Sequence, residues 1–351
     1  MSEPDTGASP EVPRRRGRTR LAFKIFIGML VAAIGLTTFS AYVLTERQAD
    51  QVRRYPGVFA GMAESERPPP TDALNFLLLG SDSLADEPTT GGDAVASGVI
   101  PGAGRSDTIM LVHIDPGFTR ATVVSIPRDA WVPVPGHGMA KVNAGYSWGG
   151  PSLAVRTIEG LTGVRVDHFG VIDFAGFQAL TDSVGGIDVG LAAPSTFGSL
   201  VLHAGTNHLN GTQALGYVRQ RTGLPKGDLD RVQRHQNALR ALLVKITTRG
   251  VLTSPSAALG FLNELTRWIT VDDSLTNDDL RTLCAELVQN LRTGGITFLT
   301  VPVSGLGRER DQSVVYLDST RGARLWHDLT NGDIAAYLRE YPGAALGEST
   351  R

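Results

Sequence analysis

Twenty consecutive residues without a charged side chain, Ile25–Leu44, follow an N-terminus that is rich in arginine. As an α-helix with about 1.5 Å of rise per residue, this run is about 30 Å long, which matches the hydrocarbon core of a bilayer. Arginines on its N-terminal side favour a cytoplasmic N-terminus. The run is too long for a signal peptide, and no small-x-small cleavage site follows it. The sequence therefore predicts a basic cytoplasmic arm at 1–20, a single transmembrane helix at 21–44 and an extracytoplasmic remainder.

The segment after the predicted helix has the composition of a spacer. Residues 45–73 are polar and include three consecutive prolines from Pro68 to Pro70, which favour an extended and stiff chain. The hydrophobic fraction of 42% allows a sizeable core. A net charge of -2 gives no basic surface for nucleic acid. We expect an extracytoplasmic spacer at 45–73, one folded domain at 74–338 and a tail at 339–351.

Short apolar runs of strand length alternate with segments of helical periodicity from residue 74 onward. A Pro-Gly pair at 116–117 predicts a hairpin between the second and third strands. The alternation predicts a single three-layer α/β/α domain with a mixed central sheet. The expected strands are 74–79, 108–114, 121–126, 164–172, 187–189, 296–301 and 314–317. The expected helices are 152–161, 174–184, 211–218, 229–248, 259–268, 278–292 and 321–329.

Two aspartates flank the glycine-rich loop 85–104. Asp82 follows the first expected strand, and Asp107 directly precedes the second. Because both border one loop, their backbones can lie close together at one edge of the sheet. A pair of carboxylates suits Mg²⁺, which takes few protein ligands and completes its shell with water and phosphate oxygens; Mn²⁺ is an alternative. Each aspartate could instead cap a turn.

Basic side chains flank the same strands. Arg105 lies two residues before Asp107, and Arg128 follows the third expected strand directly after a proline. A guanidinium can bind a phosphate through two parallel hydrogen bonds. The structural alternative for Arg128 is an ion pair with Asp107 or Asp129. Lys141 could add a further positive charge.

The segment 217–236 carries the densest group of cations. Arg219 and Arg221 occupy alternate positions, and Arg231, Arg234 and His235 share one face of the expected helix 229–248. The N-terminus of a helix also favours anions, because its free N–H groups point outward. A solvated helix face with ordinary ion pairs is the structural alternative. The number of arginines favours an anion site.

Carboxylates for a metal and several arginines for phosphates are what phosphoryl transfer requires, because positioning and charge neutralisation supply most of the catalysis. The sequence contains no glycine-rich loop followed by Lys-Ser/Thr, so an NTPase is not supported. It also lacks a Gly-x-Ser-x-Gly elbow and a zinc-type spacing of histidines and cysteines. The sequence thus favours a phosphotransferase.

Several segments, in this order and behind this predicted anchor, resemble the LytR-CpsA-Psr family of cell-wall phosphotransferases. The resemblance spans roughly residues 74 to 330, and its specificity comes from the agreement of many segments in order. The matching segments are Asn75–Asp82, Arg105–Thr108, Ser125–Asp129, Lys141–Asn143, Val171–Phe174, Val184–Val189, Leu209–Leu215, Tyr217–Arg221 and Asp228–Gln236.

The resemblance implies an enzyme that moves a glycopolymer from a polyprenyl pyrophosphate carrier to a peptidoglycan hydroxyl, with pyrophosphatase activity as a side reaction. It implies that Asp82 and Asp107 bind magnesium, and that an apolar tunnel between the sheet and the helices takes the lipid. The residues implied in pyrophosphate binding are Arg105, Arg128, Lys141, Arg219, Arg221, Arg231 and Gln236. Those implied in catalysis are Arg105, Asp107, Arg128, Arg219 and Arg221.

Two other functions fit parts of the pattern. A non-catalytic protein that binds lipid pyrophosphate, or a cell-wall scaffold, would use the same arginines, but pure binding needs no metal pair. A membrane-bound gene regulator is disfavoured because the cytoplasmic arm is too short for a DNA-binding domain. All but four of the basic residues are arginine, which favours an actinobacterial source. Arabinogalactan or another wall glycan is then the expected polymer.

Overall fold

The computed structural model describes residues 52–81, 106–220, 223–225, 227–248, 261, 264–290, 295–309 and 311–350. These residues belong to one compact unit, 48–351. The transmembrane helix expected at 21–44 lies outside the described residues. Within the described part of the chain, no helix combines the length and the apolar character needed to cross a bilayer.

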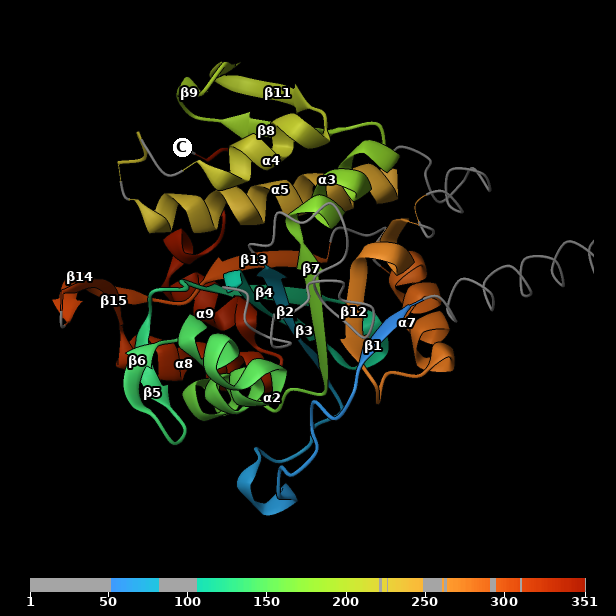
Figure 1. The fold of residues 1–351 in the computed structure, drawn as a ribbon, viewed down its shortest axis with the longest axis vertical. Coiled ribbons are helices and arrows are strands. Elements are labelled where there is room, and N and C mark those ends of the chain that lie inside the picture. Colours follow the sequence, from blue (N-terminus) through green and yellow to red (C-terminus); the bar gives the residue numbers. More distant parts are fainter. Residues whose placement is uncertain are drawn as a thin grey trace, which may run out of the picture. The chain divides into compact units, whose positions relative to one another are not determined.

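A seven-stranded mixed sheet forms the centre of the domain (Figure 1). In spatial order its strands are β1 (Arg53–Tyr55), β12 (Ile269–Asp272), β7 (His168–Asp173), β2 (Leu74–Ser81), β3 (Ser106–Ile114), β4 (Ala121–Ile126) and β13 (Ile296–Thr300). β2 runs antiparallel to β3, which runs antiparallel to β4, whereas β2 is parallel to β7 and β4 is parallel to β13. This arrangement confirms the predicted α/β class and the hairpin between the second and third expected strands.

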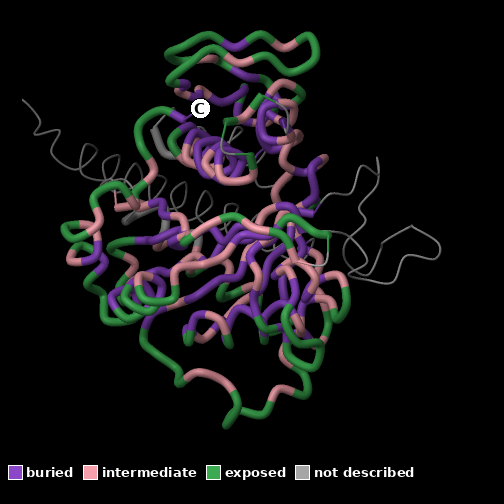
Figure 2. The backbone as a smooth tube through the Cα atoms, turned by 90° about the vertical axis from the view of Figure 1, so that its left-hand side faces the viewer, coloured by how far each residue is buried: buried purple, intermediate pink, exposed green. Residues whose placement is uncertain are grey.

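Helices cover both faces of the sheet, and alternate residues of each central strand point to opposite faces. On one face, Leu77 and Leu111 join a core with α2 (Asn143–Thr162), α8 (Ser319–Thr330) and α9 (Ile334–Glu340). The other face, which includes Met110, packs against α5 (Asp228–Thr248) and α7 (Asn277–Asn290). Figure 2 shows the buried residues concentrated in these strands and in the helices around them. Burial on both faces explains why the strands read as continuous apolar runs.

A second, smaller core lies beyond α5. There α3 (Phe174–Ser183), α4 (Gly211–Arg219) and the antiparallel pair β8 (Ile187–Leu191) and β11 (Gly205–Leu209) pack together. Three further strand pairs lie outside the main sheet. Of their six strands, the sequence predicted only the one at 314–317. The pairs are β5 (Trp131–Val134) with β6 (Gly138–Lys141), β9 (Ser195–Phe197) with β10 (Leu200–Leu202), and β14 (Val303–Glu309) with β15 (Gln312–Leu317).

Helix α2 begins at Asn143, nine residues before the start expected at Ser152. Gly149 and Gly150 interrupt it with non-helical backbone, and Gly150 has φ of 61°. The sequence predicts a start at 152 because serine is a common N-cap residue. The Ser152 hydroxyl is no cap here, since it donates to the Val58 carbonyl at 2.6 Å. The first two turns of α2, which precede the interruption, border the site described below.

The N-terminal part of the described chain lies against the domain. Strand β1, inside the segment expected to be a spacer, pairs in parallel with β12 at the edge of the sheet. Val58 is buried in the core under α2. Arg67 forms an ion pair of 2.7 Å with Glu159 of α2. Backbone pairing and a buried ion pair thus fix residues 53–67 to the domain.

The C-terminal segment, residues 342–350, joins the main sheet to the smaller core. The Leu346 N–H donates to the Phe298 carbonyl of β13 at 2.9 Å. Four residues later, Thr350 exchanges backbone hydrogen bonds with Gly190 and Ala192 at the end of β8. Its hydroxyl lies 2.8 Å from the Tyr217 hydroxyl. This segment thus fastens β13 to β8.

Candidate active site

The candidate site lies at the end of the central strands where β3 begins and β4 ends. Because these strands are antiparallel, Asp107 at the start of β3 lies beside Arg128, which follows β4. The two side chains form an ion pair. The sequence placed both residues at strand ends, and the structure brings them into contact.

The N-terminus of α5 lies next to Asp107 and Arg128 at these strand ends. Asp228, the first residue of α5, forms an ion pair with Arg231 one turn later. Its Oδ1 atom also lies 3.8 Å from the Nε atom of Arg128. Opposite charges thus alternate along Asp107, Arg128, Asp228 and Arg231. All four side chains are at most 17% exposed, so solvent screens the cluster weakly.

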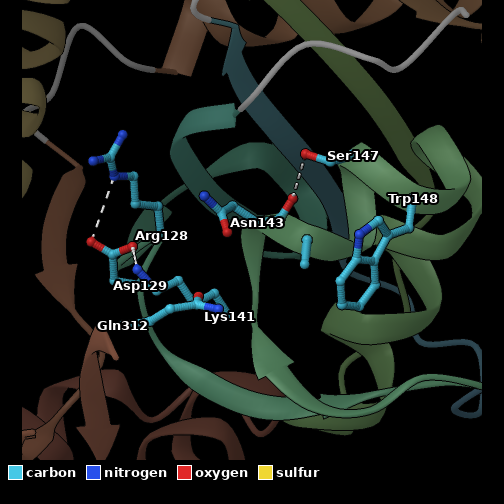
Figure 3. Close-up of a pocket in the computed structure, with 8 residues that line it drawn as sticks. Arg128, Asp129, Lys141, Asn143, Ser147, Trp148 and Gln312 are labelled. Atoms are coloured by element: carbon cyan, nitrogen blue, oxygen red, sulfur yellow. Dashed lines mark hydrogen bonds and ion pairs between the residues drawn. The ribbon is translucent and has the colours of Figure 1, made fainter. Parts of the chain in front are cut away.

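Arg128 also contacts a second group of charged side chains, which lies toward α2. The Arg128 Nε atom lies 3.7 Å from Asp129, and Asp129 accepts from Lys141 at 2.8 Å (Figure 3). Lys141 ends β6 immediately before α2. We use the term charged cluster for Asp107, Arg128, Asp129, Lys141, Asp228 and Arg231.

Several buried polar atoms around the charged cluster have no hydrogen-bond partner among the described residues. They are Ser106 Oγ, Ser125 Oγ, Asp228 Oδ2, Arg231 Nε and Gln236 Oε1. Burial also raises the pKa of Asp228, because desolvation outweighs the attraction of Arg231. Buried polar groups without partners are rare, and they mark places where water, an ion or a ligand binds.

An apolar cavity of about 140 Å³ lies between the sheet and helices α3, α4 and α5, and its lining includes Thr108, the residue after Asp107. Its lining includes Leu78 and Met110 of the sheet, Phe177 of α3, Val218 of α4 and Leu239 of α5. This cavity lies where the resemblance places a lipid tunnel.

Arg219 lies at the apolar cavity rather than in the charged cluster. Its guanidinium stands over the ring of Phe174, 5.2 Å from the ring centre, and Phe174 lines the cavity. A cation held over an aromatic ring is favourable.

His235 lines the apolar cavity and forms hydrogen bonds to both the sheet and α4. Its Nδ1 atom lies 2.8 Å from the Thr108 hydroxyl, and its Nε2 atom lies 2.9 Å from the Val218 carbonyl. A carbonyl only accepts, so Nε2 carries the proton and Nδ1 accepts from Thr108. Gly80 leaves room for Thr108, because a Cβ atom there would lie 2.9 Å from the Thr108 Cβ. Burial, reinforced by the charge of Arg231, lowers the pKa of His235 to about 4.

The depressed pKa of His235 predicts a loss of stability in acid. The unfolded chain binds a proton below pH 6.5, whereas the folded chain binds it only near pH 4. The contribution is therefore full above pH 6.5 and is lost as the pH falls toward 4. Between pH 7 and pH 5, we expect His235 to cost about 2 kcal/mol of unfolding free energy. Urea denaturation of the wild type and of His235→Gln at both pH values measures this difference. Equal pH dependence in the two proteins would contradict it.

The residues expected to share one face of α5 do not all reach the site. Arg231 and His235 point to the site, but Arg234 is fully buried and donates to Gln220 at 2.6 Å and to Ser195 at 2.9 Å. Arg234 therefore supports the smaller core, and its placement on an anion-binding face was wrong. Gln236 is also fully buried, and its amide donates to the Leu299 carbonyl of β13.

Three sequence-predicted site residues, Asp82, Arg105 and Arg221, lie outside the described residues. Ser81 pairs with Ser106 across β2 and β3. The two ends of the loop that carries Asp82 and Arg105 are therefore adjacent in the sheet. In the described part of the chain, no group of three or more His, Cys, Asp or Glu side chains is arranged to hold a metal ion.

A second cavity, of about 370 Å³, lies on the other side of the charged cluster. We call it the polar cavity. Arg128, Asp129 and Lys141 line one side, Trp148 of α2 stands opposite, and Asn143 lies between them (Figure 3). Its other lining residues are Ala144, Ser147 and Gln312. No sequence pattern indicated Trp148 or Gln312, which meet here from segments far apart in the chain.

The fold and the site define an α/β domain that sets a buried cluster of charges beside an apolar cavity, as suits a ligand with an anionic head and an apolar chain. The chain belongs to the LytR_cpsA_psr family, whose model matches residues 43–330. This confirms the resemblance.

Named relatives agree with this membership. The chain is 40% identical over 244 residues to the probable cell wall biosynthesis protein LcpB of Corynebacterium glutamicum, covering 67% of this chain and 55% of that protein. It is 26% identical over 308 residues to the polyisoprenyl-teichoic acid–peptidoglycan teichoic acid transferase TagU of Bacillus cereus, covering 87% and 93%. The match thus spans about half the length of the Corynebacterium relative and nearly all of TagU.

Among solved structures, protein gbs0355 of Streptococcus agalactiae superposes with a TM-score of 0.62 at 25% identity. The superposition covers 74% of this chain and 87% of that protein. The described domain therefore has the same fold as this solved structure.

Proposed function

We propose that this protein is a membrane-anchored, extracytoplasmic phosphotransferase. It moves a glycopolymer from a polyprenyl pyrophosphate carrier to a peptidoglycan hydroxyl. The observation that carries the proposal is that the charged cluster and the apolar cavity meet at the start of β3, where Thr108 lines the cavity directly after Asp107. This donor joins a pyrophosphate to an apolar chain. The names of the relatives, a cell wall biosynthesis protein and a teichoic acid transferase, support the same chemistry.

In the proposed reaction, the acceptor oxygen attacks the phosphorus nearest the sugar. An oxygen–phosphorus bond forms, the bond to the bridging oxygen breaks, and polyprenyl phosphate leaves while the hydroxyl releases its proton. Arg128, Lys141 and Arg231 supply positive charge for the phosphate oxygens, together with Arg105, Arg219 and Arg221. Fixed charges in a partly buried site stabilise the charge that develops in the transition state. Gln236 orients α5 against β13, because its amide donates to the Leu299 carbonyl.

We propose Mg²⁺, with Mn²⁺ as an alternative, as the metal, held by Asp82 and Asp107. The polar atoms without partners around Asp107 are mostly oxygens, the donor type that magnesium prefers. The bound ion would neutralise charge on the pyrophosphate. The residues of the charged cluster orient the phosphates whether or not the metal contributes to the rate.

The proposed function predicts transfer that depends on a divalent cation. The full-length chain in detergent is mixed with a polyprenyl pyrophosphate-linked saccharide and peptidoglycan, and phosphodiester-linked saccharide is quantified. We expect EDTA to lower the rate at least about a hundredfold and Mg²⁺ to restore it. Donor binding without transfer to peptidoglycan would instead identify a lipid-pyrophosphate binding protein. Undiminished transfer in EDTA would refute the metal assignment alone.

A further inference from the structure

The polar cavity combines an aromatic surface with neutral hydrogen-bonding groups. Trp148 is 54% exposed, although a tryptophan usually buries most of its surface. The ring of His137 lies beside it, with 4.8 Å between the ring centres and 34° between the planes. This contact between two rings favours one orientation of the indole at the side of the cavity.

The neutral polar groups of the cavity can both donate and accept. Asn143 and Gln312 carry side-chain amides, and Ser147 carries a hydroxyl. A pyranose ring presents an apolar C–H face and a rim of hydroxyls that also donate and accept. An aromatic surface matches the first, and amides beside it match the second. A sugar ring therefore fits the chemistry of this cavity.

The position of the polar cavity indicates which sugar it receives. The apolar cavity lies on the face of the sheet covered by α5, whereas the polar cavity adjoins α2, which covers the opposite face. The charged cluster lies between them, and Arg128 lines the polar cavity directly. Phosphoryl transfer proceeds roughly in line, so the attacking oxygen approaches opposite the leaving group. With the polyprenyl phosphate toward the apolar cavity, the acceptor approaches from the polar one.

We propose that the polar cavity binds a pyranose ring of the acceptor glycan, with Trp148 against its C–H face and Asn143 and Gln312 on its hydroxyls. This inference rests on the proposed function and adds an acceptor subsite to it. Lys141, which pairs with Asp129 at 2.8 Å, belongs both to the lining of this cavity and to the charged cluster.

The test compares acceptor and donor kinetics in the full-length chain with a soluble peptidoglycan oligosaccharide as acceptor. We expect Trp148→Ala to raise the KM for the acceptor about tenfold, which corresponds to about 1.4 kcal/mol. The kcat and the KM for the donor should stay within about twofold. Trp148→Phe should recover most of the loss because it keeps an aromatic face. Gln312→Ala, at an exposed position, should raise the acceptor KM without affecting folding. Met139→Ala is the matched control, since Met139 is 50% exposed on the neighbouring hairpin and does not line this cavity.

Each outcome decides the inference separately from the proposed function. An unchanged acceptor KM in Trp148→Ala overturns the subsite, and a rise confined to the donor KM assigns the cavity to the donor glycan instead. If the wild type transfers no saccharide, the proposed function fails. In that case, calorimetry of the same oligosaccharide with the full-length chain still tests the subsite. Binding that Trp148→Ala weakens supports it, and binding that is absent or unaffected overturns it.

Discussion

Replacing Asp107 by alanine is expected to lower the rate of glycan transfer by at least about a thousandfold at saturating donor. The change removes a buried carboxylate that forms an ion pair with Arg128 and is the proposed metal ligand among the described residues. It leaves Arg128 free to turn toward Asp228 and Asp129, so the arrangement of the whole cluster changes. The initial rate of phosphodiester formation by the full-length chain measures the effect.

Asp115→Ala is the matched control, because Asp115 follows the other end of β3 and pairs with Arg120 at 2.9 Å, away from the cluster. This variant should transfer glycan at the wild-type rate. Asp107→Asn keeps the shape of the side chain without its charge, and it should be as inactive as Asp107→Ala. An active Asp107→Ala protein with an unchanged unfolding midpoint would remove Asp107 from the mechanism.

The largest effect on stability is expected for Glu159→Ala. The Glu159 carboxylate accepts from Arg67 at 2.7 Å and from the Val166 N–H at 2.9 Å, and its side chain is 5% exposed. Without it, a poorly hydrated guanidinium and a buried N–H lose their acceptor. Removing one partner of a buried pair costs about 3–5 kcal/mol. Urea denaturation of the full-length chain, followed by tryptophan fluorescence, measures the change.

Glu64→Ala provides the comparison, since it removes a similar pair at the surface. Glu64 binds Arg165 at 2.6 Å, but its side chain is 69% exposed. Water and salt screen such pairs, so this variant should unfold almost like the wild type. Equal destabilisation by the two substitutions would show that burial does not determine the strength of the pair at Glu159.

The central strands could be predicted because they are buried on both faces and therefore read as continuous apolar runs. The start of α2 was misplaced because Ser152 has the side chain of an N-cap, although the helix begins at Asn143 and resumes after the interruption at Gly149 and Gly150. Short strands such as β5 and β9 have alternating or polar residues and gain their stability from one partner strand. Local sequence carries little signal for that kind of pairing.

Part of the site was accessible from the sequence for a geometric reason. Asp107 and Arg128 flank strands that form a hairpin, so the topology alone brings them together. Helical periodicity, in contrast, shows which residues share a face and not what that face meets. Arg231 and Arg234 are one turn apart on α5, yet one joins the charged cluster and the other is enclosed by Gln220 and Ser195.

The C-terminal segment that fastens β13 to β8 also sets an order of events during synthesis. Gly190 and Thr350 meet across a separation of 160 residues, so this connection forms only after residue 350 has been synthesised. Until then Tyr217, fully buried in the finished domain, lacks its Thr350 partner. Contacts between residues far apart in the sequence form late, and apolar surface stays exposed to solvent until they form. The nascent protein therefore passes through a stage at which its smaller core can be captured by a chaperone or a protease.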